Sequence, residues 1–315
     1  MKHRLSPFVV ISTSLLLATA LPVSAALTTT TVAVDCNAGQ TITAVLNAQT
    51  TATPLIINVS GTCNESVTID RDDVSLVGTN ASIVAPANSN GVAVRAAYRV
   101  TLDTLTITSS LNGVTIGDSP HVAIKNSKIS GDFTGVFVTG LSSASIQNTT
   151  ITPKTTPSSA TGLVVNGNAA ATLATSTISD FVTGVGVYAI GSSSVTLGSY
   201  LDASSTTISG NGIGVAILGN STVMTGNAVI ENNGNGVHAF ASSTFLVPVA
   251  GTATVRNNQH PGIVLNTGST AALLNGSTLN ISGNGDSAVQ CYGTGYVLDV
   301  IPPAKTNITG TVNCK

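Results

Sequence analysis

The chain has 315 residues and a formal net charge of −2, and 8% of its residues are charged, against about 25% in typical globular domains. A hydrophobic content of 42% excludes a disordered chain, because disorder requires low hydrophobicity with high net charge. A balance of 11 Lys and Arg against 13 Asp and Glu supplies no basic field for nucleic acid, so we expect no nucleic-acid partner. The scarcity of charge also disfavours a helical protein, whose exposed faces are usually built from Glu, Lys, Gln and Arg.

The N-terminus has the pattern of a signal peptide. Residues 1–4 are a short basic start, residues 8–21 are mostly apolar, and residues 23–25 form an A-x-A-like cleavage site. We predict a signal peptide at 1–25 and a mature chain at 26–315 that is exported to the periplasm or the cell exterior. The apolar stretch is too short for a typical membrane span, so we expect no membrane insertion.

The one helix that the sequence predicts covers residues 41–48. Ile42, Val45 and Leu46 lie on one face of this helix. We expect it to cap the N-terminal end of the fold, because an open edge of a sheet invites another chain to pair.

Two short segments alternate along the chain from Gly91 onward. The first resembles Gly-Val-x-Val, and its intervals are 22, 22, 27, 22, 30, 22, 26 and 26 residues. It begins at Gly91, Gly113, Gly135, Gly162, Gly184, Gly214, Gly236, Gly262 and Ala288. The second resembles Thr-Ile-Ser and is centred on Ile107, Ile129, Ile151, Ile178, Ile208, Ile230, Val255, Ile281 and Ile308. Such repeats are typical of solenoids, in which each unit stacks on the next.

The alternation within the first segment predicts a strand with one buried face. Stacking the units puts the residue after each Gly into one buried column: Val92, Val114, Val136, Leu163, Val185, Val215, Val237, Ile263 and Val289. A parallel solenoid with ~4.8 Å between rungs satisfies both repeats, because each coil closes its backbone hydrogen bonds on the next. We predict a single all-β domain, a parallel β-helix of about ten rungs, with extra loops at 153–160, 198–205 and 248–252.

The four cysteines fit this stack as two disulfides. Cys36 and Cys63 are 27 residues apart and Cys291 and Cys314 are 23 apart, each about one unit. A disulfide needs Cα atoms roughly 4.4–6.8 Å apart, which is close to one rung spacing. We therefore predict the pairs Cys36–Cys63 and Cys291–Cys314, one near each end. No C-x-x-C spacing favours the alternative of a metal site, and we expect neither a metal nor a cofactor.

The Gly-Val-x-Val segments, the Thr-Ile-Ser-Gly-Asn run at 207–211, and the openings at 35–40 and 67–78 together form a known pattern. They resemble the right-handed parallel β-helix proteins of the pectate-lyase-like superfamily, over nearly the whole mature chain. The resemblance implies a right-handed coil. It implies no single function, because lyases, glycosidases, epimerases, tailspikes and adhesins share the repeat.

No carboxylate appears on the predicted outward face of the first strands, at the second and fourth positions after each Gly. General acid–base catalysis needs titratable groups within reach of one bond, and this face offers none. A second set of charges falls in adjacent units: Arg95, Arg99, Asp103, Asp118, Lys125 and Lys128. We interpret these as solubility charges, and Asp70, Asp72 and Asp73 as turn residues rather than calcium ligands.

Aromatic side chains gather on the outward face, in a chain with only 5 Tyr and 6 Phe. The candidate ligand-binding residues are Phe137, Tyr188, His238, Phe240 and Tyr292. Flat rings on a long rigid surface can stack against sugars, and an exposed apolar patch marks a contact site. A loop or a partner chain that covers this face is the other interpretation, and the sequence leaves the oligomeric state open.

We expect an exported, non-catalytic protein that presents a rigid surface for binding to polysaccharide or to the cell surface. One alternative is a polysaccharide lyase or glycoside hydrolase whose catalytic residues lie in the inserted loops. Another is an adhesin or an ice-binding scaffold, in which the Thr and Ser residues flanking Ile107, Ile151, Ile178 and Ile208 would form a flat ladder. Thr is also a favoured residue on any exposed strand.

Overall fold

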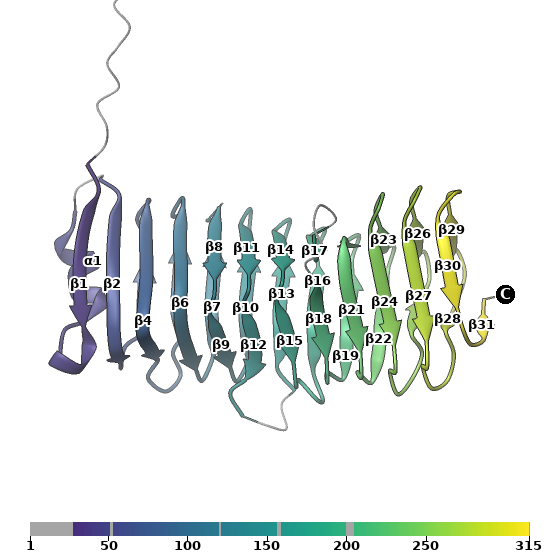
Figure 1. Ribbon diagram of the computed structural model, residues 1–315, viewed down its shortest axis with the longest axis horizontal. Coiled ribbons are helices and arrows are strands. Elements are labelled where there is room, and N and C mark those ends of the chain that lie inside the picture. The colour runs from purple at the N-terminus through teal and green to yellow at the C-terminus, as the bar shows by residue number, and fades with distance from the viewer. Residues whose placement is uncertain (1–27, 51–52, 120, 156–158, 200–204, 315) are drawn as a thin grey trace, which may run out of the picture.

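Short strands of alternating apolar and polar residues coil into a parallel β-solenoid whose coils lie side by side along the long axis (Figure 1). The computed structural model describes residues 28–50, 53–119, 121–155, 159–199 and 205–314. The predicted signal peptide at 1–25 lies outside these residues, as do parts of the predicted loops at 153–160 and 198–205. Within the described part, no helix is long and apolar enough to cross a membrane.

The strands form two sheets, one of 20 and one of 11 strands, and every pairing is parallel. The larger sheet has two columns. The first contains β1 (Thr30–Asp35), β2 (Leu55–Cys63), β4 (Val74–Val84), β6 (Val100–Ser109), β8 (Val122–Lys125), β11 (Ser143–Gln147), β14 (Ala170–Ala174), β17 (Ser194–Leu197), β20 (Thr222–Thr225), β23 (Thr244–Val247), β26 (Thr270–Leu273) and β29 (Val297–Val300). The second contains β9 (Lys128–Gly131), β12 (Thr150–Pro153), β15 (Thr177–Ser179), β18 (Thr206–Ser209), β21 (Asn227–Glu231), β24 (Thr252–Arg256), β27 (Thr278–Ser282) and β30 (Lys305–Ile308). The long strand β6 joins the columns, because it pairs with both β8 and β9.

The 11-stranded sheet forms the third side of the solenoid. It contains β3 (Val67–Ile69), β5 (Val92–Arg95), β7 (Asn112–Gly117), β10 (Thr134–Thr139), β13 (Thr161–Asn166), β16 (Val185–Ile190), β19 (Ile213–Leu218), β22 (Asn235–Ala239), β25 (Ile263–Leu265), β28 (Val289–Cys291) and β31 (Val312–Asn313). The all-β fold is confirmed, and the stack has about 11 turns where the sequence predicted about ten.

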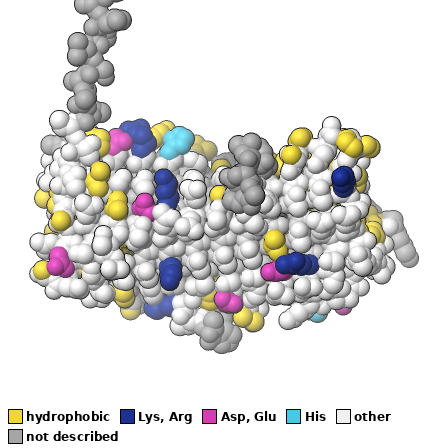
Figure 2. Space-filling model, in the orientation of Figure 1, with side chains coloured by type: hydrophobic (Ala, Val, Ile, Leu, Met, Phe, Trp, Pro, Cys, Tyr) yellow, Lys and Arg dark blue, Asp and Glu magenta, His cyan; other side chains and the backbone are white. Residues whose placement is uncertain are grey.

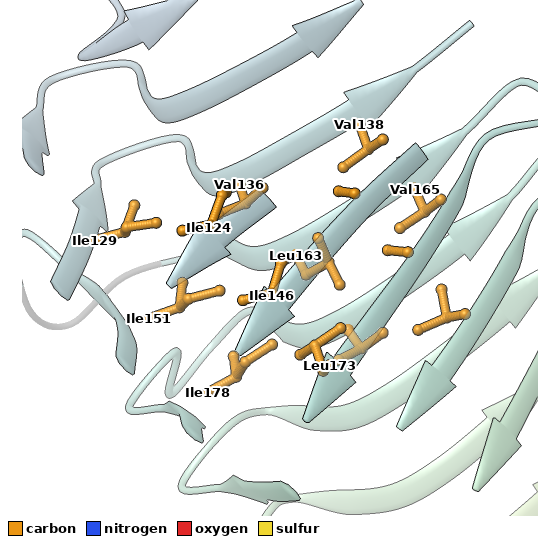
Figure 3. Packing of buried hydrophobic residues seen from close by; sticks show 14 of the residues in the cluster. Ile124, Ile129, Val136, Val138, Ile146, Ile151, Leu163, Val165, Leu173 and Ile178 are labelled. Atoms are coloured by element: carbon orange, nitrogen blue, oxygen red, sulfur yellow. The ribbon is translucent and has the colours of Figure 1, made fainter. Parts of the chain in front are cut away.

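Like residues stack on like inside the solenoid, and this stacking forms the core. Ile129, Ile151 and Ile178 follow one another in register in the second column, and each is at most 1% exposed (Figure 3). The Ile column predicted from the Thr-Ile-Ser repeat is confirmed from Ile107 through Ile308. Each buried side chain therefore contacts its equivalents one coil above and below, which provides the dense packing that a narrow core requires.

One member of the predicted Val column is wrong. Leu163 pairs with Val187, and Val187 pairs with Val215, so that Val187 is the buried member of the column, whereas Val185 is only partly buried and lies outside it. The Gly of this unit is Gly186 and not Gly184. A Cβ on Gly186 would lie 2.6 Å from the carbonyl oxygen of Gly214, which explains why this position requires glycine.

The N-terminal coil is closed by a short helix, as predicted. Helix α1 (Ile42–Ala48) follows the 3-10 turn η1 (Cys36–Ala38), and the Thr41 side chain caps α1 by accepting a hydrogen bond from the Ala44 N–H at 3.2 Å. Ile42 is fully buried against the core. Both carboxylate oxygens of Glu65 accept backbone N–H groups of the first turn, from Ile42 at 2.7 Å and from Thr43 at 3.0 Å.

A buried asparagine ladder forms the corner between the second column and the 11-stranded sheet. The Nδ2 of Asn211 donates to Oδ1 of Asn233 at 3.0 Å, Asn233 donates to Asn258 at 3.1 Å, and Asn258 donates to Asn284 at 2.8 Å. The same acceptor oxygens also receive backbone N–H groups. These polar side chains can be buried because they are hydrogen-bonded along the stack.

Both predicted disulfides are confirmed. Cys36–Cys63 has a Cα–Cα distance of 5.0 Å, and Cys291–Cys314 has one of 4.8 Å. Each bond joins one coil to the next, near opposite ends of the stack. Two disulfides fit a compartment that keeps thiols oxidised.

Candidate functional site

The outer face of the 11-stranded sheet carries the predicted aromatic residues. We call it the neutral face and define it as the outward side chains of β7, β10, β13, β16, β19, β22, β25 and β28, together with Phe240, Asn266 and Tyr292, which directly follow the last three strands. One column along this face, in register, is Thr115, Phe137, Val164, Tyr188, Ala216, His238, Val264 and Gln290. The neighbouring column is Gly117, Thr139, Asn166, Ile190, Leu218, Phe240, Asn266 and Tyr292.

The five candidate residues fall into these two columns. Phe137, Tyr188 and His238 share the first column and are separated from one another by a single aliphatic residue, so a ring occurs at every second rung. Phe240 and Tyr292 lie in the second column. Tyr292 is 54% exposed, whereas the other four side chains are partly buried. All five side chains are therefore partly accessible at the surface.

His238 is tied into the face by its neighbours. Its ring centroid lies 3.7 Å from that of Phe240, and the amide Nδ2 of Asn266 donates a hydrogen bond to its Nε2 at 2.8 Å. Its Nδ1 is buried without a partner among the described residues. Burial lowers the pKa of His238 to about 4, so the ring is neutral near pH 7.

None of the described outward side chains of the neutral face is an Asp, Glu, Lys or Arg. Acid–base catalysis on a glycosidic bond requires such groups in pairs. The side chains that this face does offer are aromatic rings, aliphatic groups, hydroxyls and amides. These groups can stack and hydrogen-bond.

The acidic turn near the N-terminus is held by the protein itself. The Arg99 guanidinium binds both carboxylate oxygens of Asp73, at 2.6 and 2.7 Å, and Asp72 accepts the Tyr98 backbone N–H at 2.7 Å. The hydrogen bonds from Arg99 lower the pKa of Asp73. These contacts give Asp72 and Asp73 a structural role, in agreement with their interpretation as turn residues.

The other charged side chains that the sequence singled out do not form one patch. Arg95 lies in β5 of the 11-stranded sheet, Lys125 in β8 of the first column and Lys128 in β9 of the second. Asp103 accepts a hydrogen bond from Asn126 at 2.9 Å. On the side drawn in Figure 2, charged side chains are few and lie apart or in pairs. Such scattered surface charges fit a contribution to solubility.

The Thr and Ser residues on either side of the Ile column form two rows of side chains, and charged residues interrupt each row. Lys128 lies between Thr106 and Thr150 in register, and the ion pair of Arg256 with Glu231, at 2.7 Å, follows Ser209. The described residues thus contain no unbroken Thr face along this column.

One group of potential metal ligands has a different role. The sulfur atoms of Cys36 and Cys63 and a carboxylate oxygen of Glu65 lie within 4.8 Å of one another. The two sulfur atoms are bonded to each other, and Glu65 accepts the N–H groups of α1. A disulfide sulfur is no thiolate ligand. Glu65 therefore caps α1, and the disulfide links two neighbouring coils.

The coil geometry agrees with a known family. Residues 90–248 match the family model of the right-handed β-helix region. The chain belongs to this β-helix family. No curated protein matches this β-helix chain at a significant level.

Solved structures with a similar fold include an enzyme, an enzyme module and an adhesin. Pectate lyase Pel9A is 12% identical, with 87% of this chain and 80% of that chain covered and a TM-score of 0.52. The A-module of the mannuronan C-5 epimerase AlgE4 of Azotobacter vinelandii is 14% identical, with 85% and 95% covered and a TM-score of 0.49. PfbA, a surface adhesin of Streptococcus pneumoniae, is 9% identical, with 89% and 93% covered and a TM-score of 0.42. At such identities the likeness to Pel9A concerns the fold alone.

The sequence missed part of the neutral face of this β-helix. Val185, Ile190 and Ile213 are partly exposed apolar residues of β16 and β19 that the outward-face pattern did not include. Val185 was predicted to be buried because Gly184 was taken as the first residue of its unit. The spacing from the Ile column could not have shown the error, because Gly184 follows Ile178 by six residues, just as Gly113 follows Ile107.

Proposed function

We propose that the mature protein is exported and, without catalysing a reaction, presents the neutral face as a rigid surface that binds polysaccharide. The observation that carries this proposal is the register of Phe137, Tyr188 and His238, which fixes rings at alternate rungs of one column. The C–H faces of sugars pack on such rings, and the neighbouring hydroxyl and amide groups can bind sugar hydroxyls.

Two further observations support it. Neither Asp, Glu, Lys nor Arg occurs among the described outward residues of this face, which argues against catalysis there. The two disulfides favour an oxidising compartment, where a polysaccharide surface is available. The likeness in fold to a pectate lyase adds only that such a coil can carry a polysaccharide site.

A glycan array tests the proposal. The parent protein should be retained on one class of polysaccharide, and the triple variant Phe137→Ala, Tyr188→Ala, Phe240→Ala should lose that retention. Tyr98→Ala and Phe133→Ala remove exposed rings outside the neutral face and serve as matched controls, which should be retained like the parent. Absence of retention by the parent, or equal retention by the triple variant, contradicts the proposal. Release of unsaturated or reducing ends from any bound polymer would replace it with a lyase or hydrolase.

A further inference from the structure

The neutral face is long as well as uncharged. It crosses eight strands, from β7 to β28, and seven spacings of ~4.8 Å give it a length of about 34 Å. Over that length the only titratable side chains are His238, which is neutral near pH 7, and the phenols of Tyr188 and Tyr292. Arg95, one strand before β7, lies at the edge of this region. The two columns therefore carry no formal charge themselves, and Asp118, which directly follows β7 and lies beside Gly140, places one carboxylate at their edge.

This lack of charge restricts the chemistry of the ligand. A polyuronate carries a carboxylate on each sugar, and stacking such a sugar on an aromatic ring removes water from that carboxylate. Desolvating a charge is unfavourable unless a cation or several hydrogen bonds replace the water. The described outward residues of the neutral face supply no Lys or Arg for that purpose. A neutral sugar loses no charge hydration on the same surface.

The ring positions restrict the direction of the ligand. Phe137, Tyr188 and His238 are two rungs apart, about 9.6 Å at ~4.8 Å per rung, along a line that crosses the strands. Hydrogen-bonding side chains flank this line, with Thr139 and Asn166 on adjacent rungs of the neighbouring column. An extended chain along the solenoid axis would place sugars over successive rings with its hydroxyls beside these groups. A chain across the axis would meet one or two rings only.

We infer that the ligand is a neutral, extended polysaccharide that lies along the solenoid axis on the neutral face. This inference rests on the proposed function and specifies its substrate class. It also separates this surface from any site built for acidic polymers, because recognition here uses ring faces, hydroxyls and amides in place of ion pairs.

Calorimetric titration with oligosaccharides of matched length tests the inference. The probes are neutral β-1,4-linked gluco- and manno-oligosaccharides and, as the acidic counterpart, oligogalacturonates. The parent should bind a neutral probe with an affinity that changes little with salt, and an acidic probe at least about tenfold more weakly. Longer neutral probes should bind more tightly until they span the rings from Phe137 to Tyr292.

A charge-gain variant provides the converse test. Thr139→Lys with Asn166→Lys places two cations side by side on adjacent strands of the face. This variant should gain salt-sensitive binding of oligogalacturonate, and circular dichroism should show an unchanged fold. Preference of the parent for the acidic probe would overturn the inference and leave the proposed function standing. Binding of neither class, with no retention on the array, would remove the proposed function and the inference together.

Discussion

The two ends of the solenoid differ in how they close the core. At the N-terminal end, α1 lies across the first coils, Ile42 is fully buried, and Glu65 binds the first turn of the helix. At the C-terminal end, the inward side chains Val300 and Val312 are 38% and 44% exposed. Their partners one coil earlier, Leu273 and Val289, are fully buried.

This difference in exposure shows that the apolar side chains of a coil are buried by the coil that follows it. Each coil is covered by the next, so the last coil lacks the burial that its sequence pattern would otherwise give it. Cys291–Cys314 ties this coil to its neighbour at a Cα–Cα distance of 4.8 Å, but it does not cover the open side chains. The N-terminal end has both a disulfide and a helix that lies across it. We therefore expect the two ends to respond differently to the same kind of change.

The largest difference is expected for apolar truncations. Ile42→Ala should lower the free energy of unfolding by about 2–5 kcal/mol, because it leaves a cavity under α1. Val300→Ala should cost less than about 1 kcal/mol, because the side chain is already partly in water. Denaturant titration of the mature protein measures both values. Equal losses would show that the C-terminal coil is covered in solution.

The disulfides give a second comparison. Replacing Cys36 and Cys63 by Ser should lower the global stability by about 3 kcal/mol, because the bond closes a loop of 27 residues in the unfolded chain. Replacing Cys291 and Cys314 should instead speed hydrogen exchange in β29–β31 and leave the main unfolding transition nearly unchanged. A fall of the main transition in both variants would contradict this difference between the ends.

The third prediction concerns the middle of the stack and is confined to acidic pH. The pKa of His238 in the folded protein, about 4, lies below its ordinary value of 6.5. The neutral ring therefore contributes its full stability above pH 6.5, and that contribution is lost as the pH falls from 6.5 toward 4. Melting temperatures of the parent and of His238→Gln, compared across this window, isolate the effect. Parallel curves for the two proteins would show that His238 titrates normally.

The repeating part of the molecule could be predicted because almost every coil contains the same two sequence segments, Gly-Val-x-Val and Thr-Ile-Ser. The Ile column from Ile107 to Ile308 and both disulfides follow from spacing alone, since one unit of sequence equals one rung of height. The frame failed at Gly184, because this glycine fits the Gly-Val-x-Val pattern and the usual spacing from the preceding Ile better than Gly186 does. The pairing of Val187 with Leu163 and Val215, which the pattern does not show, identifies Gly186 as the glycine of this unit.

The candidate site was predicted only in part, because its surface arises from neighbours in space. The alternation of residues placed Phe137, Tyr188 and His238 outward, and the register puts them in one column. The stacking of His238 on Phe240 and its hydrogen bond to Asn266 depend on rotamers that no sequence pattern reports. The contacts that hold Asp72 and Asp73 likewise come from residues about one unit away.

Hydroxyl-radical footprinting with a bound neutral oligosaccharide tests the central claim most directly. The account predicts that Phe137, Tyr188 and Tyr292 become protected from oxidation when the oligosaccharide is added. Tyr98 and Phe133, which are 44% and 70% exposed outside the neutral face, should react as before. Protection of Tyr98 and Phe133, with none at Phe137, Tyr188 and Tyr292, would contradict the assignment of this face as the binding surface.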